Sequence, residues 1–522
     1  MRTLIVCLCV ASLPAAAATC ESLSGASLPD TSVTIAQSVP AGRFTPPYGG
    51  AFDKMPAFCR VAGVIAPTRD SYIRFEVWMP AADWNGRFLG VGNGGFAGAI
   101  GFGSMAANLK RGYATAGTDT GHEGDGEDAS WAYHHPEKVI DFGYRALHLT
   151  AVNAKSLIQV FYGHTAQHSY FDSCSDGGRE ALMEAQRFPA DYDGILAGAP
   201  ANFWTHLLAT GLDIAKSIYT DPAGYIPSIK FPAISAAVLA ACDAQDGVKD
   251  GIINDPSRCR FDPATLLCKG RDSRTCLTAP QVASLRKLYA GGRNSHGEPL
   301  FPGYTPGAEE GRGGWVPWLI GNGPGGSSGS VYTENYFRYM VFEDPVWNPL
   351  TADVDAALHK ADQETAQALN AVDTDLHQFQ ARDGKLILYH GWNDPAITPL
   401  NTINYYKGVI HAMGRENAER FVRLYMVPGM QHCIGGPGPT WFGQLGTTTA
   451  KGPEHGVYDA LEQWVEKGVP PGPIVATQYT EDNPGKAVKM TRPLCPYPEI
   501  AVYNGTGDTN DSASFDCRLP DN

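Results

Sequence analysis

Two kinds of apolar pattern alternate along residues 20–202. Short runs such as YIRFEVWMP, GRFLGVG and GYATAG either alternate apolar and polar positions or are apolar throughout, which is typical of β-strands. The longer run Val139–Gly163 has helical spacing and ends at a glycine, which predicts a helix. Because strands alternate with helices, we predict an α/β fold built on a mostly parallel sheet.

The alternation stops after about Asn202. The following residues, 203–372, contain two close cysteine pairs, clusters of aromatic residues and the glycine-rich stretch GPGGSSGS. Strand-like runs return in DGKLILYHGWND and RFVRLYMVPGMQHC, and GVYDALEQWVEKG predicts a further helix. We therefore predict one α/β core, residues 20–202 and 373–522, interrupted by a lid domain at 203–372.

The N-terminus has the three parts of a secretory signal peptide. Arg2 supplies the positive end, Leu4–Leu13 the apolar stretch and Ala15–Ala18 the small residues before cleavage. We expect residues 1–19 to be removed and the mature protein to be secreted, either extracellular or periplasmic. A lipid anchor on Cys20 is a weaker alternative.

Charge and hydropathy exclude two classes of partner. The net charge of −14 argues against nucleic acid and anionic membranes, which favour a basic face. We also expect no membrane span, because no apolar run in the sequence approaches the roughly 20 residues that a spanning helix needs.

Export makes the cysteines candidates for disulfides. Of the twelve cysteines, two lie in the signal peptide, which leaves ten. Short loops close at the lowest entropic cost. This favours the local pairs Cys20–Cys59, Cys242–Cys259, Cys268–Cys276 and Cys495–Cys517. Cys174 and Cys433 then remain, although spacing alone does not prove connectivity. The chain has no C-x-x-C spacing, so we do not expect zinc.

Ser175 lies in YFDSCSDGGREALMEAQRFP, between a strand-like run and a helix-like run. A strand, a tight turn that holds a serine among small residues, and a helix form the layout of a nucleophile elbow, G-x-S-x-G. Gly177 fits the last position of that signature, and Ser173 replaces its first glycine. On these residues alone, a polar turn that caps a helix is an equally good interpretation.

Two later strand-like runs end in candidate partners for Ser175. Asp394 follows the first run and His432 follows the second. Loops at the carboxyl ends of parallel strands carry the chemistry of open sheets, and the order Ser, Asp, His is that of α/β-hydrolases. Asp394 taken singly also fits an Asx turn before Pro395, and His432 an ordinary loop residue. Their joint order and placement favour the catalytic interpretation.

The two remaining cysteines adjoin this set. Cys174 precedes Ser175, and Cys433 follows His432. A disulfide between them would hold their Cα atoms at roughly 5.5 Å and so keep the serine loop beside the histidine loop. A serine hydroxyl needs a base within hydrogen-bond reach to become a good nucleophile.

The stretches CSDGGRE, WNDP and GMQHCIGGPGP resemble the tannase and feruloyl esterase family of α/β-hydrolases, which has a Cys-Ser, Asp, His-Cys pattern. The resemblance covers nearly the whole mature chain, including TRPLCPYP near the end. It implies Ser175 as nucleophile, His432 as general base and then general acid, and Asp394 as the residue that orients the imidazole. The family also includes mono(2-hydroxyethyl) terephthalate hydrolases.

An oxyanion hole needs two backbone N–H groups. In an elbow, the residue after the nucleophile, Asp176, provides one. The stretch GVGNGGFAG follows an early strand, where such enzymes place the second donor, so we expect Gly95 there and Gly94 as the next choice.

A short acidic stretch, CDAQDGVKDGIIND, contains Asp243, Asp246 and Asp250. Carboxylates this close repel one another unless they are protonated, solvated or neutralised by a hard cation such as Ca²⁺. On the residues alone, a solvated acidic loop is an equally good interpretation. The family resemblance implies a structural calcium site here, with the backbone carbonyls of Val248 and Ile252 as further ligands. No organic cofactor is expected.

These observations predict a secreted serine carboxylic-ester hydrolase that works through an acyl-enzyme. We expect a small or plant polysaccharide-linked ester of an aromatic acid, bound between the core and the aromatic stretches GGWVPWL and YTENYFRYMVF of the lid. Feruloyl esters are the first choice and galloyl esters the second. A terephthalate monoester is the third, because Gly325–Phe337 has no arginine or lysine for its carboxylate. Glu334 in that stretch would repel a carboxylate and accept a hydrogen bond from a phenol.

Two interpretations from other classes remain open. A calcium-stabilised carbohydrate-binding or surface protein would carry the same residues as a vestigial triad, and a fluorophosphonate would then fail to label Ser175. A secreted peptidase would share the triad but cleave peptides rather than p-nitrophenyl esters.

Overall fold

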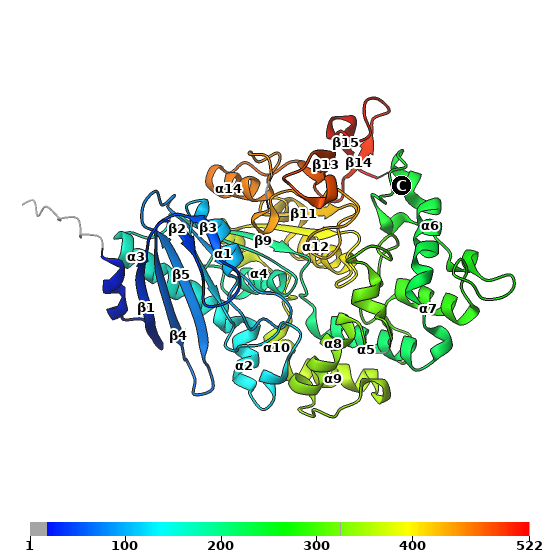
Figure 1. Ribbon diagram of the computed structural model, residues 1–522, viewed down its shortest axis with the longest axis horizontal. Coiled ribbons are helices and arrows are strands. Elements are labelled where there is room, and N and C mark those ends of the chain that lie inside the picture. The colour runs from blue at the N-terminus through cyan, green and yellow to red at the C-terminus, as the bar shows by residue number, and fades with distance from the viewer. Residues whose placement is uncertain (1–17, 324, 448, 521–522) are drawn as a thin grey trace, which may run out of the picture.

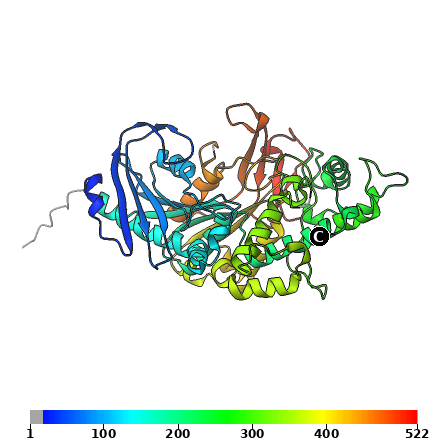
Figure 2. The same ribbon diagram turned by 60° about the horizontal axis from the view of Figure 1, so that its bottom comes forward.

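The computed structural model describes residues 18–323, 325–447 and 449–520. Figure 1 shows a central sheet with helices against it and a helical lobe at the opposite end of the molecule from the first strand, and Figure 2 shows the same separation from another side. The predicted signal peptide falls almost entirely on residues 1–17, outside the described residues.

The main sheet of the described chain has nine strands, and the strands β6 to β11 are joined to one another by parallel pairs. The pairs β1–β4, β4–β5 and β5–β7 are antiparallel. The prediction of a mostly parallel sheet is therefore confirmed. In sheet order the strands are β1 (Thr31–Val39), β4 (Phe58–Ile65), β5 (Ile73–Pro80), β7 (Ala114–Thr118), β6 (Arg87–Val91), β8 (His168–Cys174), β9 (Gly194–Gly198), β10 (Lys385–Gly391) and β11 (Val422–Val427).

The antiparallel end of this sheet was only partly expected from the sequence. The strand-like run at residues 72–80 forms β5, but β1 and β4, which add two antiparallel strands beyond it, were not predicted. Three small two-stranded sheets accompany the main one. They pair β2 (Gly42–Phe44) with β3 (Phe52–Met55), β12 (Ile474–Tyr479) with β13 (Val488–Leu494), and β14 (Ile500–Tyr503) with β15 (Phe515–Arg518).

Hydrophobic side chains cover both faces of the sheet because successive strand residues point to opposite sides. In β9, Ile195 and Ala197 belong to one apolar cluster and Leu196 to another. The predicted helix at 139–163 is observed, with a π-helical turn near its start, and it ends at Gly163 in the left-handed region (φ 78°). The helices of the core are α1 (Phe102–Lys110), α2 (Pro136–Ile140), α3 (Ala146–Tyr162), α4 (Asp176–Arg187), α11 (His377–Ala381), α12 (Pro399–Met413), α13 (Arg415–Ala418) and α14 (Val457–Lys467).

The lobe between β9 and β10 is helical and has an apolar cluster of its own. A second cluster joins it to the core, where Trp204 and Tyr336 of the lobe pack with Phe96 and Phe142. The lobe contains α5 (Trp204–Tyr219), α6 (Phe231–Cys242), α7 (Ala279–Ala290), α8 (Ser328–Asn335), α9 (Val354–Glu364) and α10 (Ala366–Leu369). We call this lobe the lid.

By length and composition alone, one described segment, Pro222–Asp246, is long and apolar enough to cross a membrane. This differs from the expectation that no apolar run approaches such a length. The segment consists of α6 with short 3-10 turns before and after it, and it packs into the apolar cluster of the lid.

Candidate active site

Ser175 occupies a strained turn between β8 and α4. Its backbone has φ 70° and ψ −124°, which a residue other than glycine rarely adopts and which marks functional turns. A Cβ at Gly177 would lie 1.8 Å from Ser173 Oγ, so this position accepts only glycine. Ser173, in place of the first glycine of the signature, is buried beside Gly177. The strand–turn–helix layout expected from the sequence is present.

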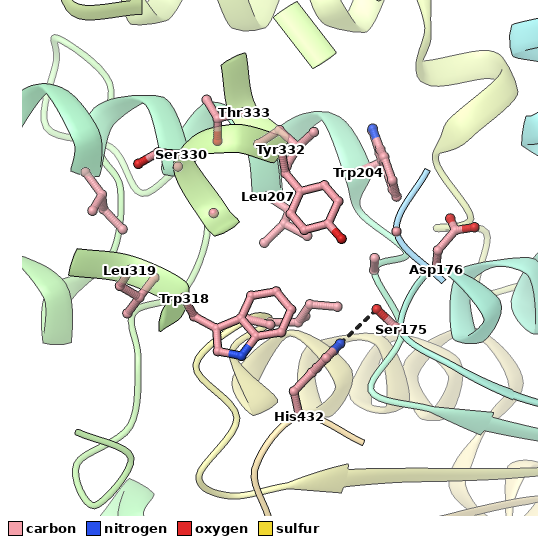
Figure 3. A pocket seen from close by; sticks show the side chains of 18 of the residues that line it. Ser175, Asp176, Trp204, Leu207, Trp318, Leu319, Ser330, Tyr332, Thr333 and His432 are labelled. Carbon is pink, nitrogen blue, oxygen red and sulfur yellow. Dashed lines mark hydrogen bonds between the residues drawn. The ribbon is translucent and has the colours of Figure 1, made fainter. Parts of the chain in front are cut away.

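Three side chains from three strand ends form one hydrogen-bonded line. His432 Nε2 lies 2.8 Å from Ser175 Oγ (Figure 3), and His432 Nδ1 lies 2.7 Å from Asp394 Oδ2. A carboxylate only accepts hydrogen bonds, so Nδ1 carries the proton and Nε2 is free to accept from the serine hydroxyl. The structure thus brings the three residues together in the order needed for proton transfer.

Asp394 is fully buried, yet it remains a carboxylate. Burial alone would raise its pKa, but the electrostatic attraction to His432 and the hydrogen bonds from His390 and His432 outweigh burial and hold the pKa below the usual value. Its Oδ1 also accepts from the backbone N–H groups of Ala396 and Ile397, at 2.8 and 3.0 Å. Asp394 therefore does both things that the sequence analysis considered: it forms an Asx turn and it accepts the hydrogen bond of His432.

A second histidine, which the sequence analysis did not single out, contacts this carboxylate. His390 has no exposed surface, and its Nε2 lies 3.2 Å from Asp394 Oδ2 and 3.0 Å from the Ile397 carbonyl oxygen. Its Nδ1 lies 2.7 Å from Thr402 Oγ1. The available signal was its place in LILYHGWND, on β10 itself and four residues before Asp394.

A disulfide joins the loops of the serine and the histidine. Cys174 and Cys433 are bonded across a sequence separation of 259, with their Cα atoms 6.0 Å apart. The other eight cysteines of the described chain form the four local pairs that were predicted. Because each bonded cysteine is adjacent to a triad residue, the bond limits how far Ser175 and His432 can separate.

The two residues predicted to provide the oxyanion hole line the same pocket. Asp176 and Gly95 both line the pocket that contains Ser175 and His432, whereas Gly94 does not line it. Within the described chain, neither the Asp176 N–H nor the Gly95 N–H donates a hydrogen bond. Asp176 is the first residue of α4, where N–H groups have no partner in the helix. Its side chain points elsewhere and pairs with buried Arg179 at 2.6 Å.

The pocket lies between the core and the lid and has a volume of about 780 Å³, its open mouth included. Trp318 contacts the ring of His432 edge to face, with ring centroids 5.1 Å apart, and Tyr332 lies on the α8 side (Figure 3). Side chains of α5, among them Leu207 and Ile214, extend the apolar wall away from Ser175. The described lining contains no lysine or arginine. It comprises Gly95, Ser175, Asp176, Ala201, Trp204, Leu207, Leu208, Gly211, Ile214, Ala215, Tyr304, Trp318, Leu319, Gly329, Ser330, Tyr332, Thr333, Ala396, Ile397 and His432.

Glu334 does not take the part expected of it. Its carboxylate pairs with Arg338 one helical turn later, and it is not among the residues that line the pocket. The expectation that Glu334 meets a substrate phenol is therefore wrong. Its neighbours Tyr332 and Thr333 face the pocket instead, because successive helical residues point in different directions.

The acidic loop of the lid has the donor chemistry of a calcium site but a different arrangement of charges. Burial and then the charge of Asp250 raise the pKa of Asp246 to about 6, although a hydrogen bond from Val248 N–H opposes this. Asp250 is paired with Arg492 from β13, and Asp243 accepts from Gly251 N–H at 3.2 Å.

The three carboxylates of this loop do not converge. Among the described residues, the only group of three acidic, cysteine or histidine ligands within 4.8 Å of one another is Cys268, Asp272 and Cys276, and those cysteines are already bonded to each other. The carbonyl oxygens of Val248 and Ile252 accept no hydrogen bond from the described chain. The oxygen donors thus suit Ca²⁺, and binding would require the carboxylates to move closer together.

Similarity to known proteins extends over nearly the whole chain. The family model described as tannase and feruloyl esterase matches residues 59–518. An uncharacterized esterase of Xanthomonas campestris pv. campestris is 43% identical over 99% of this chain and 94% of its own length. A protein named Probable feruloyl esterase B-2, from Aspergillus terreus, is 35% identical over 94% of this chain and 93% of its own. The crystal structure of feruloyl esterase B from Aspergillus oryzae superposes with a TM-score of 0.88 at 31% identity, over 96% of this chain and 99% of that one.

Proposed function

The chain belongs to the tannase and feruloyl esterase family of α/β-hydrolases, and we propose that it is a serine carboxylic-ester hydrolase that cleaves feruloyl esters. The observation that carries the proposal is the hydrogen-bonded line Asp394–His432–Ser175, which ends in an apolar pocket. The family resemblance and the fold inferred from the sequence are confirmed. The roles of individual residues are our assignment.

The first half of the reaction forms an acyl-enzyme. His432 Nε2 takes the hydroxyl proton of Ser175 while Oγ attacks the ester carbonyl, whose π electrons move to oxygen. Asp394 accepts the Nδ1–H hydrogen bond and stabilises the imidazolium. His432 then gives the proton to the departing alkoxide, which leaves as the alcohol.

The second half returns the enzyme to its starting state. His432 takes a proton from water as the water oxygen attacks the acyl carbon, and it then protonates Ser175 Oγ as that oxygen leaves. The product is the free carboxylic acid. In both halves, negative charge develops on the former carbonyl oxygen. The N–H groups of Asp176 and Gly95, which donate no hydrogen bond within the described chain, are our candidates for its donors, because both residues line the pocket.

Three observations support a feruloyl substrate. The two Aspergillus proteins described above bear the names Probable feruloyl esterase B-2 and feruloyl esterase B, at 35% and 31% identity. The pocket wall is apolar and aromatic, which suits a flat ring. No lysine or arginine of the described chain lines the pocket, so a second carboxylate, as in a terephthalate monoester, would be desolvated without a cationic partner. Galloyl esters are the second choice.

A panel of esters tests this order. We expect kcat/KM for methyl ferulate or methyl caffeate to exceed that for methyl gallate, and all three to exceed that for a terephthalate monoester, at one pH. A clear preference for the terephthalate monoester would contradict the argument from the pocket. A preference for methyl gallate would keep the mechanism and change the substrate.

Labelling of the serine separates the proposal from the other protein classes. A fluorophosphonate should label Ser175 and abolish hydrolysis of p-nitrophenyl esters, whereas a binding protein with a vestigial triad would not react. Cleavage of peptides in preference to esters would indicate a peptidase.

We further propose that the protein is secreted after removal of residues 1–19. Five disulfides in the described chain are compatible with an oxidising compartment and support this proposal. Mass spectrometry of the exported protein should find a mature N-terminus near residue 19 or 20. A lipid-modified Cys20 would support the alternative, although Cys20 is disulfide-bonded to Cys59 in this structure.

We also propose that the acidic loop of the lid binds a structural calcium ion. Asp243, Asp246 and Asp250 would hold it, with the carbonyl groups of Val248 and Ile252. Two features support this proposal. All the proposed ligand atoms are oxygens, which Ca²⁺ prefers, and the raised pKa of Asp246 indicates that its buried carboxylate lacks enough positive charge nearby, which a cation would provide. The ion would stabilise the lid and take no part in ester cleavage.

A further inference from the structure

We propose that this protein binds a neutral saccharide chain in a groove on the antiparallel end of the sheet, apart from the pocket of Ser175. The groove is formed by residues of β1, β4 and the start of β5, by the segment after β7, by the loop before α1, and by the segment between β2 and β3 that contains Tyr48. The residues that carry the argument are Tyr48, Tyr72, Arg74, Ile100, Asp119 and Glu123.

The groove contains the two most exposed aromatic side chains of the described surface. Tyr72 is 53% exposed and Tyr48 is 42% exposed, and no other described phenylalanine, tyrosine or tryptophan belongs to the strongly exposed class. A single exposed apolar side chain is ordinary, but two aromatic rings in one groove indicate a binding surface. Tyrosine suits a ligand that offers both C–H faces and hydroxyl groups, because its ring is apolar and its edge is polar.

The floor of the groove has an unsatisfied hydrogen-bond acceptor. Asp119 is 2% exposed, and its Oδ1 accepts from the backbone N–H groups of Arg74 and Gly121, each at 2.9 Å. Its Oδ2 is buried and has no partner in the described chain. Burial raises the pKa of this carboxyl to about 7. Buried polar atoms are rarely left unpaired, and because this oxygen has almost no exposed surface, a water molecule between it and the ligand would supply the missing donor.

The rim of the groove offers both kinds of hydrogen-bonding group. Arg74 and Glu123 form a partly exposed ion pair there, and the Arg74 guanidinium lies 5.5 Å from the centre of the Tyr72 ring. Such a pair provides donors and acceptors to neutral hydroxyl groups, whereas the adjacent carboxylates disfavour an anionic ligand. This combination favours a neutral saccharide.

The groove and the pocket open at the same edge of the sheet. The start of β5 lies beside the carboxyl end of β7, three strand positions from β8 in the sheet order, which corresponds to about 14 Å at the usual strand spacing. Ile100 lines the groove, and Gly95, in the same loop, lines the pocket. If the proposed function holds, a polysaccharide whose ester group is in the pocket also reaches the groove.

Affinity electrophoresis in gels that contain neutral arabinoxylan tests the groove directly. We expect the polysaccharide to retard the wild-type protein, and Tyr72→Ala and Asp119→Asn to lose most of that retardation. Leu519→Ala, a control at another strongly exposed apolar side chain, should behave as wild type. No retardation of the wild type, or full retardation of both groove variants, would overturn the proposal.

Activity assays keep this proposal separate from the proposed function. Tyr72→Ala should hydrolyse methyl ferulate at the wild-type rate but release ferulate from feruloylated arabinoxylan severalfold more slowly. Failure of the wild type on methyl ferulate would contradict the esterase proposal and leave binding in the groove to be judged by electrophoresis. Equal rates of the two proteins on the polysaccharide would contradict any contribution of the groove to the substrate.

The geometry independently points to His390 as a positioning residue for the Ser175 site. Both neighbours of its Nε2, the carboxylate of Asp394 and the carbonyl of Ile397, only accept hydrogen bonds. Nε2 therefore carries a proton, and a neutral His390 accepts from Thr402 at Nδ1. Asp394 Oδ2 is then held by two imidazoles, while Oδ1 is held by two backbone N–H groups. The carboxylate cannot rotate without losing one of these bonds.

Two substitutions that differ in side-chain length test whether His390 positions Asp394. His390→Gln can keep an N–H group near the position of Nε2, whereas His390→Asn is too short to reach Asp394. We expect His390→Asn to lower kcat about tenfold or more with KM nearly unchanged, and His390→Gln to recover most of the rate. Thr402→Val, which removes only the partner of Nδ1, should stay close to wild type. Titration of reactive serines with a fluorophosphonate corrects for unfolded protein.

The outcomes are distinct. Equal losses in His390→Asn and His390→Gln would show that the histidine contributes only packing. A wild-type kcat in His390→Asn would show that Asp394 needs no second imidazole.

Discussion

The loop of Ser175 and the acidic loop of the lid are both closed by a disulfide, and they differ in what that bond joins. Cys174–Cys433 connects two strand ends that are 259 residues apart, whereas Cys242–Cys259 closes a local loop across 17 residues. The long-range bond fixes the relation between two reacting side chains. The local bond limits only the freedom of one loop.

The two loops also differ in how their buried carboxylates are compensated. Despite its burial, Asp394 has a pKa below the usual value, because two histidines and two backbone N–H groups surround it. Burial raises the pKa of Asp246 to about 6, and its own loop supplies one backbone N–H. The carboxylate of Asp394, which must be ionised at neutral pH, is thus paired by four groups of the fold. The carboxylate of Asp246 has fewer partners, so a bound cation would be needed to neutralise it.

The sharpest test of the first loop is Ser175→Ala. We expect it to lower kcat by a factor on the order of 10⁴ or more, because in the described chain Ser175 provides the one hydroxyl that is hydrogen-bonded to His432 Nε2. The melting temperature should stay close to wild type, since only one oxygen is lost. Hydrolysis of a p-nitrophenyl ester and differential scanning fluorimetry provide the two measurements. Retention of more than a few per cent of the activity would exclude Ser175 as the nucleophile.

The contribution of the long-range bond is measured by replacing Cys174 and Cys433 together with alanine. We expect kcat to fall roughly ten- to a hundredfold, because small displacements of the serine from its base are costly. The matched control replaces Cys268 and Cys276, an exposed lid pair, and should leave kcat unchanged. Non-reducing peptide mapping should recover the Cys174–Cys433 peptide. A free thiol at either position in active enzyme would contradict the role of this bond.

In the lid loop, removal of metal should affect stability and not rate. We expect a chelator to lower the melting temperature by a few degrees, because an ion bound only by the folded state stabilises it by mass action. Asp246→Asn should remove this response, whereas Asp255→Asn, which leaves the three proposed carboxylates intact, should preserve it. If carefully prepared protein contains no calcium and ignores the chelator, the loop is merely acidic.

The smallest expected effect is the pH dependence of the stabilisation that calcium gives to the lid loop. The folded pKa of Asp246 is raised above its unfolded value of 3.8 to about 6, so the folded state binds this proton more tightly. In metal-free protein, the contribution of Asp246 to stability is complete below pH 4 and is lost as the pH rises through about 6. Calcium requires the ionised form, so its stabilising effect should be larger at pH 7.5 than at pH 5. Melting curves at both values, with and without calcium, measure the difference, and an equal calcium effect at both would exclude Asp246 as a ligand.

The apolar pattern of the sequence was sufficient to predict the strands and the helix that carry Ser175, Asp394 and His432. A local apolar pattern marks the strand and the helix on either side of Ser175, and also the strands before Asp394 and His432. The structure has a strand or helix at each of these places. The four local cysteine pairs followed from proximity in the chain, which lowers the entropy cost of closure. Most of this information lies within stretches of a few residues.

The same pattern could not predict side-chain contacts between segments that are far apart in the sequence. Nothing local to His390 distinguishes a histidine that donates to Asp394 from one packed in the core. Glu334 faces Arg338 instead of the pocket because the rotation of α8 about its axis, set by packing against α5, decides which residues point inward. Ring positions such as those of Trp318 and His432 likewise depend on how the lid rests on the core.

The sequence by itself therefore determined the strands and the helix next to the triad, favoured the local disulfide pairs and placed Ser175, Asp394 and His432 in that order, because these features depend on local periodicity and on position along the chain. The tertiary structure decided the 2.8 and 2.7 Å hydrogen bonds that join the three, the burial that places Asp394 among four N–H donors, and the groove that gathers Tyr48 and Tyr72. These features depend on strand register, strand order and helix rotation, which are settled by packing among segments hundreds of residues apart.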